Sequence, residues 1–340
     1  MCDEINNAIK NNAPIEENLH MVIVISNACL YIRRYNLAKE FIKRIDNIQN
    51  VILYIVELAY DLNGKSAQNF EITDSKNPRH LQLGATDVLW NKENLLNIGV
   101  KQLLPDNWKA VALVDCDIDF DNPHFAIDAL KVLNGCKDII QLHSHVIDLG
   151  EDNNPINIFS SFGYQVTHGK KYSPLNIGWN FFHCGYNVAM TRKAYEQIGG
   201  LYEFSILGAG DFSLFLSLIG RGIESLHDNM TEGYKDTIRE YQVQCYNLKL
   251  GYISGIIRHY YHGSKKNRRY GDRYKILVKH QYDPHKHLTR NSDNLLIPTS
   301  NCPKELLSDI YNYFSERKED EGINPVIEEM KNEYIKKYGI

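Results

Sequence analysis

The chain has 340 residues, of which 43% are hydrophobic and 24% are charged, with a formal net charge of -4. This composition is typical of a globular protein with a sizeable core. The slightly acidic balance excludes a general attraction to nucleic acid or anionic lipid, so any anion site must come from a local basic cluster.

Cysteine usage and the absence of targeting signals indicate the compartment. The seven cysteines are scattered and form no C-x-x-C pair, which predicts free thiols in a reducing compartment. The N-terminus shows no basic and then apolar signal, and the longest apolar run, residues 51–56, is too short to span a bilayer. We therefore expect a cytoplasmic protein without integral membrane association and without a nucleic-acid partner.

The first sixty residues predict a βαβ unit. Residues 1–20 are polar and irregular, whereas residues 21–26 (MVIVIS) form a β-branched run typical of a parallel strand covered on both faces. Apolar side chains recur at helical spacing within residues 31–45. Residues 50–60 then read as a second buried strand, so strand, helix and strand are expected to form one right-handed unit.

An acidic cluster follows the third predicted strand. Residues 91–104 place their apolar side chains on one helical face and stop before Pro105. The buried strand at residues 110–114 (AVALV) then runs directly into DCDIDFDNP. Because open α/β sheets bind ligands at the carboxyl ends of their strands, we expect the chemistry at this cluster.

The rest of the chain predicts shorter elements and a charged tail. Strands are expected at residues 138–142, 187–190 and 251–257, and helices at residues 193–198, 212–219 and from 303 onward. No internal repeat or low-complexity linker is evident. The expected fold class is α/β, with a polar extension over residues 1–20, one domain over residues 21–300 and a helical charged tail over residues 301–340.

Asp115 and Asp117 form the central motif of the cluster. In an extended segment their carboxylates lie on one face, and a hard divalent cation held there would offset the charge of a nucleotide diphosphate. We expect Asp117 to bind the cation directly. Asp115 is expected to be a second ligand, or a partner of the ribose or of a coordinated water.

The cluster has three other interpretations. A calcium loop would need glycine where Phe120 stands. A phosphohydrolase with an aspartyl nucleophile would need Thr or Val in place of Asp119. A solvated acidic turn stays open as the structural alternative.

Two segments of the second half resemble family 2-like glycosyltransferases of the GT-A fold, particularly a group known from bacteria, phages and large DNA viruses. These segments are residues 178–201 and 206–220. The resemblance extends to Ser26 and Asn27, to VELAY at residues 56–60, to LWNKENLLN at residues 89–97, to the Asp cluster, and to HYYHGSKKNRRYGDRYKIL at residues 259–277. Parts also look like β-1,4-galactosyltransferases. The resemblance implies a Rossmann-like, mostly parallel mixed sheet flanked by helices and, for a viral chain, a location in the host cytoplasm.

The resemblance implies that Asp211, in GAGD, is the catalytic base that takes the proton of the acceptor hydroxyl. Related enzymes often carry Glu before this Asp, whereas this chain has Gly210, which leaves the orientation of the acceptor open. From the residues alone, Asp211 could equally be the N-cap of the helix at residues 212–219.

The same resemblance implies a third metal ligand at the end of the strand at residues 251–257, either His259 or His262. An imidazole beside carboxylates suits Mn²⁺ better than Mg²⁺. The basic residues that follow, among them Lys265, Arg268 and Arg273, are expected to form a lid that neutralises the leaving diphosphate. A solvated basic loop is the alternative.

Further residues are expected to contact the nucleotide sugar. Glu57 stands where related enzymes hold the base or ribose through an acidic side chain. Ser26, Asn27, Lys92 and Asn97 are additional candidates for the nucleotide sugar, and Trp179 and Tyr186 for an apolar face against the sugar. The irregular residues 148–177 are expected to set acceptor preference.

The sequence therefore predicts a metal-dependent, inverting hexosyltransferase that uses a nucleotide-diphosphate sugar, most simply a UDP-sugar, with Mn²⁺ or Mg²⁺. The acceptor is a hydroxyl group on a glycan, protein or lipid. One alternative is a sugar nucleotidyltransferase, although residues 26–35 (SNACLYIRRY) lack the Gly-rich, Arg-containing loop that this class needs. The other is a non-catalytic carbohydrate-binding protein on the same scaffold.

Overall fold

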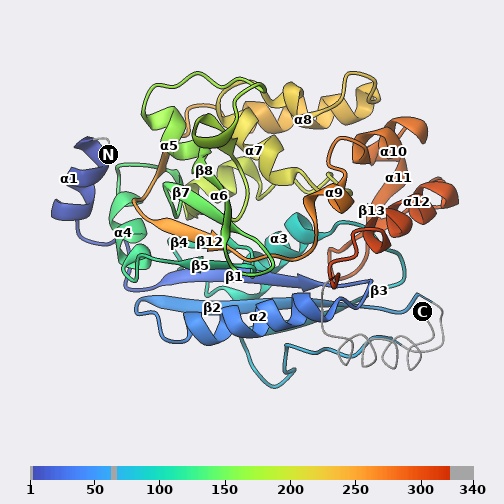
Figure 1. The fold of residues 1–340 in the computed structure, drawn as a ribbon, viewed down its shortest axis with the longest axis horizontal. Helices are drawn as coiled ribbons and strands as arrows, with labels where there is room; N and C mark the ends of the chain where they lie inside the picture. Colours follow the sequence, from blue (N-terminus) through green and yellow to red (C-terminus); the bar gives the residue numbers. More distant parts are fainter. Residues whose placement is uncertain (1–2, 63–66, 322–340) are drawn as a thin grey trace.

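The computed structural model describes residues 3–62 and 67–321, and a seven-stranded sheet forms its centre (Figure 1). In spatial order the strands are β11 (Leu250–Tyr252), β6 (Ile139–Gln141), β10 (Asn187–Thr191), β4 (Ala110–Val114), β1 (Leu19–Ser26), β2 (Val51–Tyr60) and β3 (His80–Ala85). Within this sheet, β10 runs antiparallel to both of its neighbours and the other adjacent pairs are parallel. The expected α/β class with a mostly parallel sheet flanked by helices is confirmed.

Helices cover both faces of this sheet (Figure 1). On one side lie α1 (Asp3–Asn11), α2 (Ile32–Ile45) and α4 (Phe125–Val132), and on the other α3 (Lys92–Leu103), α7 (Gly210–Leu218) and α8 (Glu232–Gln244). The sequence of strand β1 is continuously apolar because both faces of the strand are buried. Met21 and Ile23 belong to the core with α2, whereas Val22 belongs to the core with α3, because side chains alternate between the faces of a strand.

Helix α3 lies unusually close to the sheet. A Cβ atom at Gly99 would come within 2.8 Å of methyl groups of both Val22 and Val56. The glycine therefore lets the helix backbone approach β1 and β2 directly. This contact sets the position of Lys92 and Glu93 at the start of α3, beside the carboxyl end of β4.

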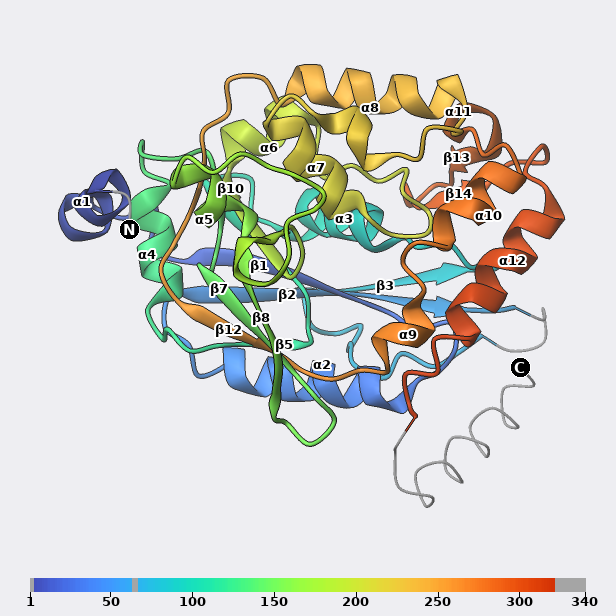
Figure 2. The ribbon, with the colours of Figure 1, turned by 45° about the horizontal axis from the view of Figure 1, so that its top comes forward.

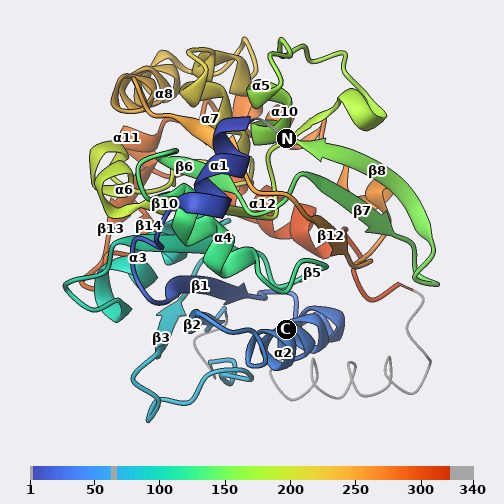
Figure 3. The ribbon, with the colours of Figure 1, turned by 90° about the vertical axis from the view of Figure 1, so that its left-hand side faces the viewer.

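A second sheet stands beside the first, with the strand order β5-β12-β7-β8-β9 (Figure 3). Its strands are β5 (Ile118–Phe120), β12 (Ile256–His259), β7 (His145–Leu149), β8 (Pro155–Ser161) and β9 (Phe182–His183). The strand expected at residues 251–257 is thus two strands, β11 in the first sheet and β12 in the second. Between them Gly255 has φ = 151°, a conformation that glycine adopts readily and that lets the chain change sheets.

The two ends of the described chain pack against the domain. The extension expected to be irregular contains α1, whose Ile5 and Ala8 are buried against α4. The tail begins with α12 (Lys304–Ser315), which packs on α10 (Arg273–Lys279), and α9 (Lys265–Arg268) lies at the same end of the molecule (Figure 2). After α12 the chain turns back, and Glu319 is fully buried. The expected tail beyond residue 321 lies outside the described residues.

The remaining elements complete the outer layers. They are α5 (Phe162–Thr167), η1 (Gly178–Asn180), α6 (Arg192–Ile198), η2 (Gly222–Ser225), α11 (Pro284–His287), β13 (Leu288–Arg290) and β14 (Leu296–Pro298). The region expected to be irregular at residues 148–177 contains β8 and α5. Across residues 3–62 and 67–321, no helix combines the length and the apolar character that a bilayer crossing requires.

Candidate metal centre and active site

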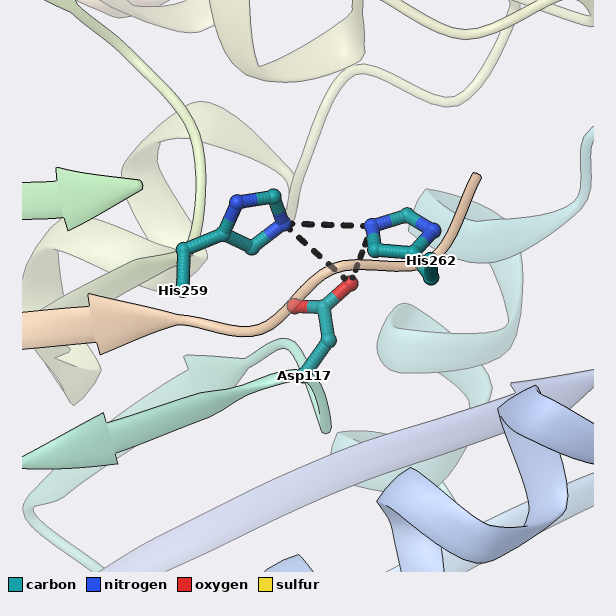
Figure 4. A group of neighbouring side chains, drawn as sticks. All are labelled: Asp117, His259 and His262. Atoms are coloured by element: carbon teal, nitrogen blue, oxygen red, sulfur yellow. Dashed lines mark hydrogen bonds and ion pairs between the residues drawn. The ribbon is translucent and has the colours of Figure 1, made fainter. Parts of the chain in front are cut away.

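Asp117, His259 and His262 converge beyond the carboxyl ends of β4 and β12 (Figure 4). The Oδ2 atom of Asp117 lies 3.0 Å from Nε2 of His262 and 3.8 Å from Nε2 of His259. The two Nε2 atoms are 3.1 Å apart. All three ligand atoms lie within 4.8 Å of one another, so both histidines are placed to bind one cation together with Asp117.

Each histidine is held from behind by a carboxylate. Nδ1 of His259 lies 2.8 Å from Oδ1 of Asp148, and Nδ1 of His262 lies 3.7 Å from Oε2 of Glu319. Asp148 and Glu319 are buried. A carboxylate behind the ring orients a histidine ligand and directs the lone pair of its other nitrogen toward the metal.

The donor set fits a divalent cation. When the Nδ1 atom of each histidine carries the proton and directs it toward its carboxylate, each Nε2 atom presents a lone pair. Two Nε2 lone pairs and a carboxylate oxygen then face one another across about 3–4 Å, and this arrangement is unfavourable without a positive charge between them. The Oδ1 atom of Asp117 is buried and has no hydrogen-bond partner among the described residues. Two imidazoles with a carboxylate suit Mn²⁺ better than the all-oxygen shell that Mg²⁺ prefers.

The local electrostatics agree with this arrangement. Burial opposes the charged form of Asp117, but His262 and His259 hold the pKa of its carboxyl group well below the usual range. The buried Asp148 also has a lowered pKa, because hydrogen bonds from His259 and Lys265 outweigh its desolvation. Both carboxylates are therefore charged at neutral pH and available to a cation and to an imidazole.

Asp115 points to a different place from Asp117. A turn at residues 116–117 separates the two side chains, and Asp115 forms an ion pair with Lys92 at the start of α3. Asp115 is thus not part of the three-residue metal cluster, although it lies next to it. The carboxylate of Asp115 raises the pKa of Lys92 against the opposing effect of burial, whereas burial raises the pKa of Asp115 itself despite the nearby charge of Lys92.

The rest of the acidic cluster diverges as well. Asp119 lies 3.4 Å from Nε of Arg44, and Asp121 pairs with Arg258. Because arginines neutralise these carboxylates separately, the segment does not gather its oxygens around one ion. Its geometry does not match a calcium loop.

A small cavity, open to solvent, is lined by Tyr186, whose ring packs against His259 of the metal cluster. It contains the Asp115–Lys92 pair and Asp211, so two of the predicted acidic residues share one cavity. Asp211 is at the second position of α7 and not at its N-cap, which is Ala209. Its Oδ1 accepts a hydrogen bond from the backbone N–H of Phe212, 2.8 Å away, and its other oxygen is left for the cavity.

Gly210 has no room for a side chain. A Cβ atom there would lie 2.6 Å from the carboxyl carbon of Glu93 and 2.7 Å from the backbone oxygen of Tyr202. Glu93 is 4% exposed and lines the same cavity as Asp211. Its pKa is raised to about 7, chiefly by burial.

Two predicted nucleotide-binding residues have structural partners. The carboxylate of Glu57 accepts hydrogen bonds from the backbone N–H groups of residues 71–73 and from the Thr73 hydroxyl. Asn97 exchanges two 2.8 Å hydrogen bonds with the backbone of Leu201. Neither residue lines the cavity of Asp211.

Ser26 and Asn27 line a second small cavity, at the end of β1. Asn27 holds the turn after β1 through hydrogen bonds with the backbone of Tyr31, while the Ser26 hydroxyl lies 2.8 Å from that of Tyr60. Arg34 and Trp90 also belong to the lining. Sequence reasoning missed Trp90, whose neighbour Lys92 it had selected.

The basic segment after His262 is folded onto the domain. Lys265 pairs with Asp148. Arg268 is buried and donates hydrogen bonds to the backbone oxygen of His262 and the hydroxyl of Tyr270. Arg273 lies over the Tyr270 ring, and its Nε is buried without a partner among the described residues.

The predicted aromatic residues lie on either side of β9. Tyr186 is buried, donates a hydrogen bond to Asp148 and stacks on the ring of His183 at a centroid distance of 4.4 Å. Trp179 is 59% exposed and packs edge-on against His145. Trp179 therefore faces solvent beside the site, whereas Tyr186 belongs to its wall.

Besides Trp90, four functional candidates escaped sequence reasoning: Glu93, Asp148, His183 and Glu319. No local pattern marks Glu93, His183 or Glu319, because each lies in a helix, strand or tail where an acid or histidine is ordinary. A carboxylate inside an apolar strand, as in the residues around Asp148, was the one usable signal.

No family model matches this sequence, and no curated protein is similar to it. Among solved structures, a Drosophila β-1,4-galactosyltransferase 7 in complex with manganese, UDP-Gal and xylobiose aligns with 86% of this chain and 98% of its own, at 10% identity and a TM-score of 0.40. A mannosyltransferase from Pyrobaculum calidifontis in complex with GDP-Man and Mn²⁺ aligns with 82% of this chain and 66% of its own, at 13% identity and a TM-score of 0.37. A glucose-1-phosphate thymidylyltransferase from Bacillus anthracis aligns with 70% of this chain and 88% of its own, at 10% identity and a TM-score of 0.32. At this level of likeness none of them assigns an activity to this chain.

Proposed function

We propose that this protein is a metal-dependent, inverting glycosyltransferase of the GT-A fold and family 2-like type found in bacteria, phages and large DNA viruses. It moves a hexosyl unit from a nucleotide-diphosphate sugar, with UDP as the nucleotide, to a hydroxyl group. Its scattered cysteines support action in a reducing compartment such as the cytoplasm.

One observation carries the proposal. Asp117, His259 and His262, from segments more than 140 residues apart in sequence, bring three donor atoms within 4.8 Å of one another, next to a cavity with an acidic residue suited to be a base. A structural cluster of two buried histidines with one carboxylate would not need an adjoining cavity with charged side chains in its wall. A cation site beside a substrate cavity does.

The residues divide into a donor end and an acceptor end. A cation held by Asp117, His259 and His262 would neutralise a diphosphate and stabilise it as a leaving group. Lys92 and Arg273 add positive charge near the cavity. Asp211 takes the proton of the acceptor hydroxyl while the oxygen of that hydroxyl bonds to the anomeric carbon. The bond between the anomeric carbon and the diphosphate oxygen breaks at the same time, and the electron pair of this bond leaves with the diphosphate.

A sugar nucleotidyltransferase is the second candidate. In the structure, the turn after β1 is formed by residues 27–31 and contains no glycine. A backbone cradle for a triphosphate needs close approach to several N–H groups. The turn is therefore poorly suited to that reaction, and the first candidate is preferred.

Two substitutions test the division of labour. Asp117→Ala should abolish Mn²⁺-dependent binding of UDP-sugars, because it removes the anionic ligand. Asp211→Asn should change donor affinity less than about threefold and lower transfer at least a hundredfold, in line with the loss of a general base. Calorimetric titration of a panel of UDP- and GDP-sugars, followed by product analysis with added sugar acceptors, measures both effects.

Asp119→Asn is the matched control, since Asp119 pairs with Arg44 outside the cluster. It should leave Mn²⁺-dependent binding unchanged. If wild-type protein binds no nucleotide sugar with Mn²⁺, or if both site variants lose donor binding equally, the proposed function is wrong.

A further inference from the structure

Glu93 is the acidic residue of the cavity that the proposed chemistry leaves without a role. It is at the second position of α3, 4% exposed, and lines the cavity together with Asp115, Lys92 and Asp211. No other described residue donates a hydrogen bond to its carboxyl group. The backbone N–H of Glu93 itself donates a hydrogen bond to this group, and a carboxyl group has further acceptor positions that a ligand can use.

The geometry around Gly210 brings Glu93 next to Asp211. The space where a side chain of residue 210 would begin is taken by the carboxyl and γ-carbon atoms of Glu93, 2.6 and 2.7 Å from the position of a Cβ atom. Asp211 is the next residue along α7. Two carboxyl groups, one from α3 and one from α7, thus stand side by side in one cavity.

The balance of charge in the cavity explains the state of Glu93. Three carboxyl groups share one ammonium group, that of Lys92, which pairs with Asp115. Burial raises the pKa of Glu93 to about 7, with a further contribution from the charge of Asp211. Near neutral pH the group therefore exists in both forms and both donates and accepts hydrogen bonds.

Gly185 lines this cavity beside Asp211. A Cβ atom at Gly185 would lie 3.1 Å from Oδ2 of Asp211 and 3.2 Å from the ring of His183. The absence of a side chain thus leaves room for a small polar group between Asp211 and His183. An uncharged polyhydroxyl ligand suits this cavity better than an anion, because its walls carry more acids than bases.

We propose that Glu93 binds a second hydroxyl group of the acceptor, next to the hydroxyl that Asp211 deprotonates, and that the acceptor is therefore a sugar with neighbouring hydroxyl groups. This inference rests on the proposed function for the role of Asp211. A serine or threonine side chain or a simple lipid alcohol offers one hydroxyl group and leaves Glu93 unpaired.

Acceptor binding tests the inference without relying on turnover. Wild-type protein, Glu93→Gln and the exposed control Glu240→Gln are titrated with methyl pyranosides of glucose, galactose, mannose and xylose, and with their monodeoxy analogues, in the presence of Mn²⁺ and UDP. We expect wild type and Glu240→Gln to bind at least one glycoside and to bind its matching deoxy analogue about 10- to 100-fold more weakly, the loss typical of a hydrogen bond to a charged group. Glu93→Gln should bind that glycoside about tenfold or more weakly and lose most of the discrimination.

Three results would overturn it: no glycoside binds to the wild type, the deoxy analogues bind as well as the parents, or Glu93→Gln binds and discriminates as the wild type does. The comparison of parent and deoxy sugars on the wild type needs no variant to fold. Sugar binding that depends on Glu93 without any transfer would instead refute the proposed function, and of this inference only the binding of a sugar hydroxyl group by Glu93 would remain.

Discussion

At the scale of single residues, a carboxylate oxygen without a partner in the described part of the chain and two closely facing imidazole nitrogens mark the site. Oδ1 of Asp117 has no hydrogen bond among the described residues, and two Nε2 atoms face each other at 3.1 Å beside its other oxygen. Folding normally satisfies such groups. Their convergence at one point is an arrangement that a bound cation stabilises and that hydrophobic packing does not explain.

The titration of Glu93 makes folding stability depend on pH. Its pKa rises from 4.5 in the unfolded chain to about 7 in the folded protein, so the folded state binds the proton more tightly. The stabilising contribution is complete below about pH 4.5 and is lost as the pH rises through about 7. Glu93→Gln cannot ionise, so its stability relative to the wild type should increase by up to about 3 kcal/mol between pH 4.5 and pH 8.

Urea unfolding of both proteins at these two pH values measures the effect. The surface variant Glu240→Gln should show no such trend. A relative stability of Glu93→Gln that is constant with pH, or that falls as the pH rises, would contradict the assignment.

At the scale of elements, the site is assembled from pieces that are remote in sequence. Strand β12 supplies His259, the loop after it supplies His262, and the segment after α12 supplies Glu319. Burial opposes ionisation of Glu319, but Arg34 and Arg317 hold its pKa well below the usual range. The segment after α12 therefore places a permanent negative charge behind His262.

Glu319→Gln should weaken Mn²⁺ binding about 10- to 100-fold, the loss typical when the carboxylate behind a histidine ligand is removed. The cause is the loss of orientation of His262, since Glu319 is itself too far from the cluster to be a ligand. Calorimetric or spin-resonance titration of Mn²⁺ measures the affinity directly.

Glu316→Gln is the matched control, because Glu316 pairs with Arg269 at the surface and does not contact His262. Its Mn²⁺ affinity should equal that of the wild type. Equal affinity in Glu319→Gln as well would show that His262 is oriented by other contacts.

At the scale of the whole molecule, a ligand that binds the folded state alone stabilises the entire fold. The metal ligands join the region after β4 to the loop after β12, so their geometry is lost when the domain unfolds. At a hundredfold excess over its dissociation constant, Mn²⁺ should add about 2.7 kcal/mol to the free energy of unfolding.

Thermal melting with Mn²⁺ and with a chelator checks this expectation. The melting temperature of the wild type should rise with Mn²⁺, and that of Asp117→Ala should not. A rise of equal size in Asp117→Ala would assign the stabilisation to cation binding elsewhere on the protein.

The amino-acid sequence by itself determined the local elements and one pair of site components. A strand or helix pattern depends on residues that are neighbours in sequence. The predicted bounds therefore agree with the observed ones to within two residues at each end for β1, β2, β4, α2 and α3. The acidic segment and the HYYH motif were likewise visible as local patterns. The structure brings Asp117 of the first next to His259 and His262 of the second, and their role as metal ligands stays a prediction.

Only the tertiary structure decided how the remaining residues divide between binding and support. The alternation of Asp115 and Asp117 assumed an extended backbone, but a turn directs one to Lys92 and the other to the histidines. Glu57 ends a strand as expected, yet the chain at residues 71–73 returns to occupy its oxygens. Glu93 contacts the position of Gly210, and Glu319 pairs with Arg34, so both acquire their environments from contacts more than a hundred residues away along the chain. Such contacts depend on how the folded elements pack, which no local pattern encodes.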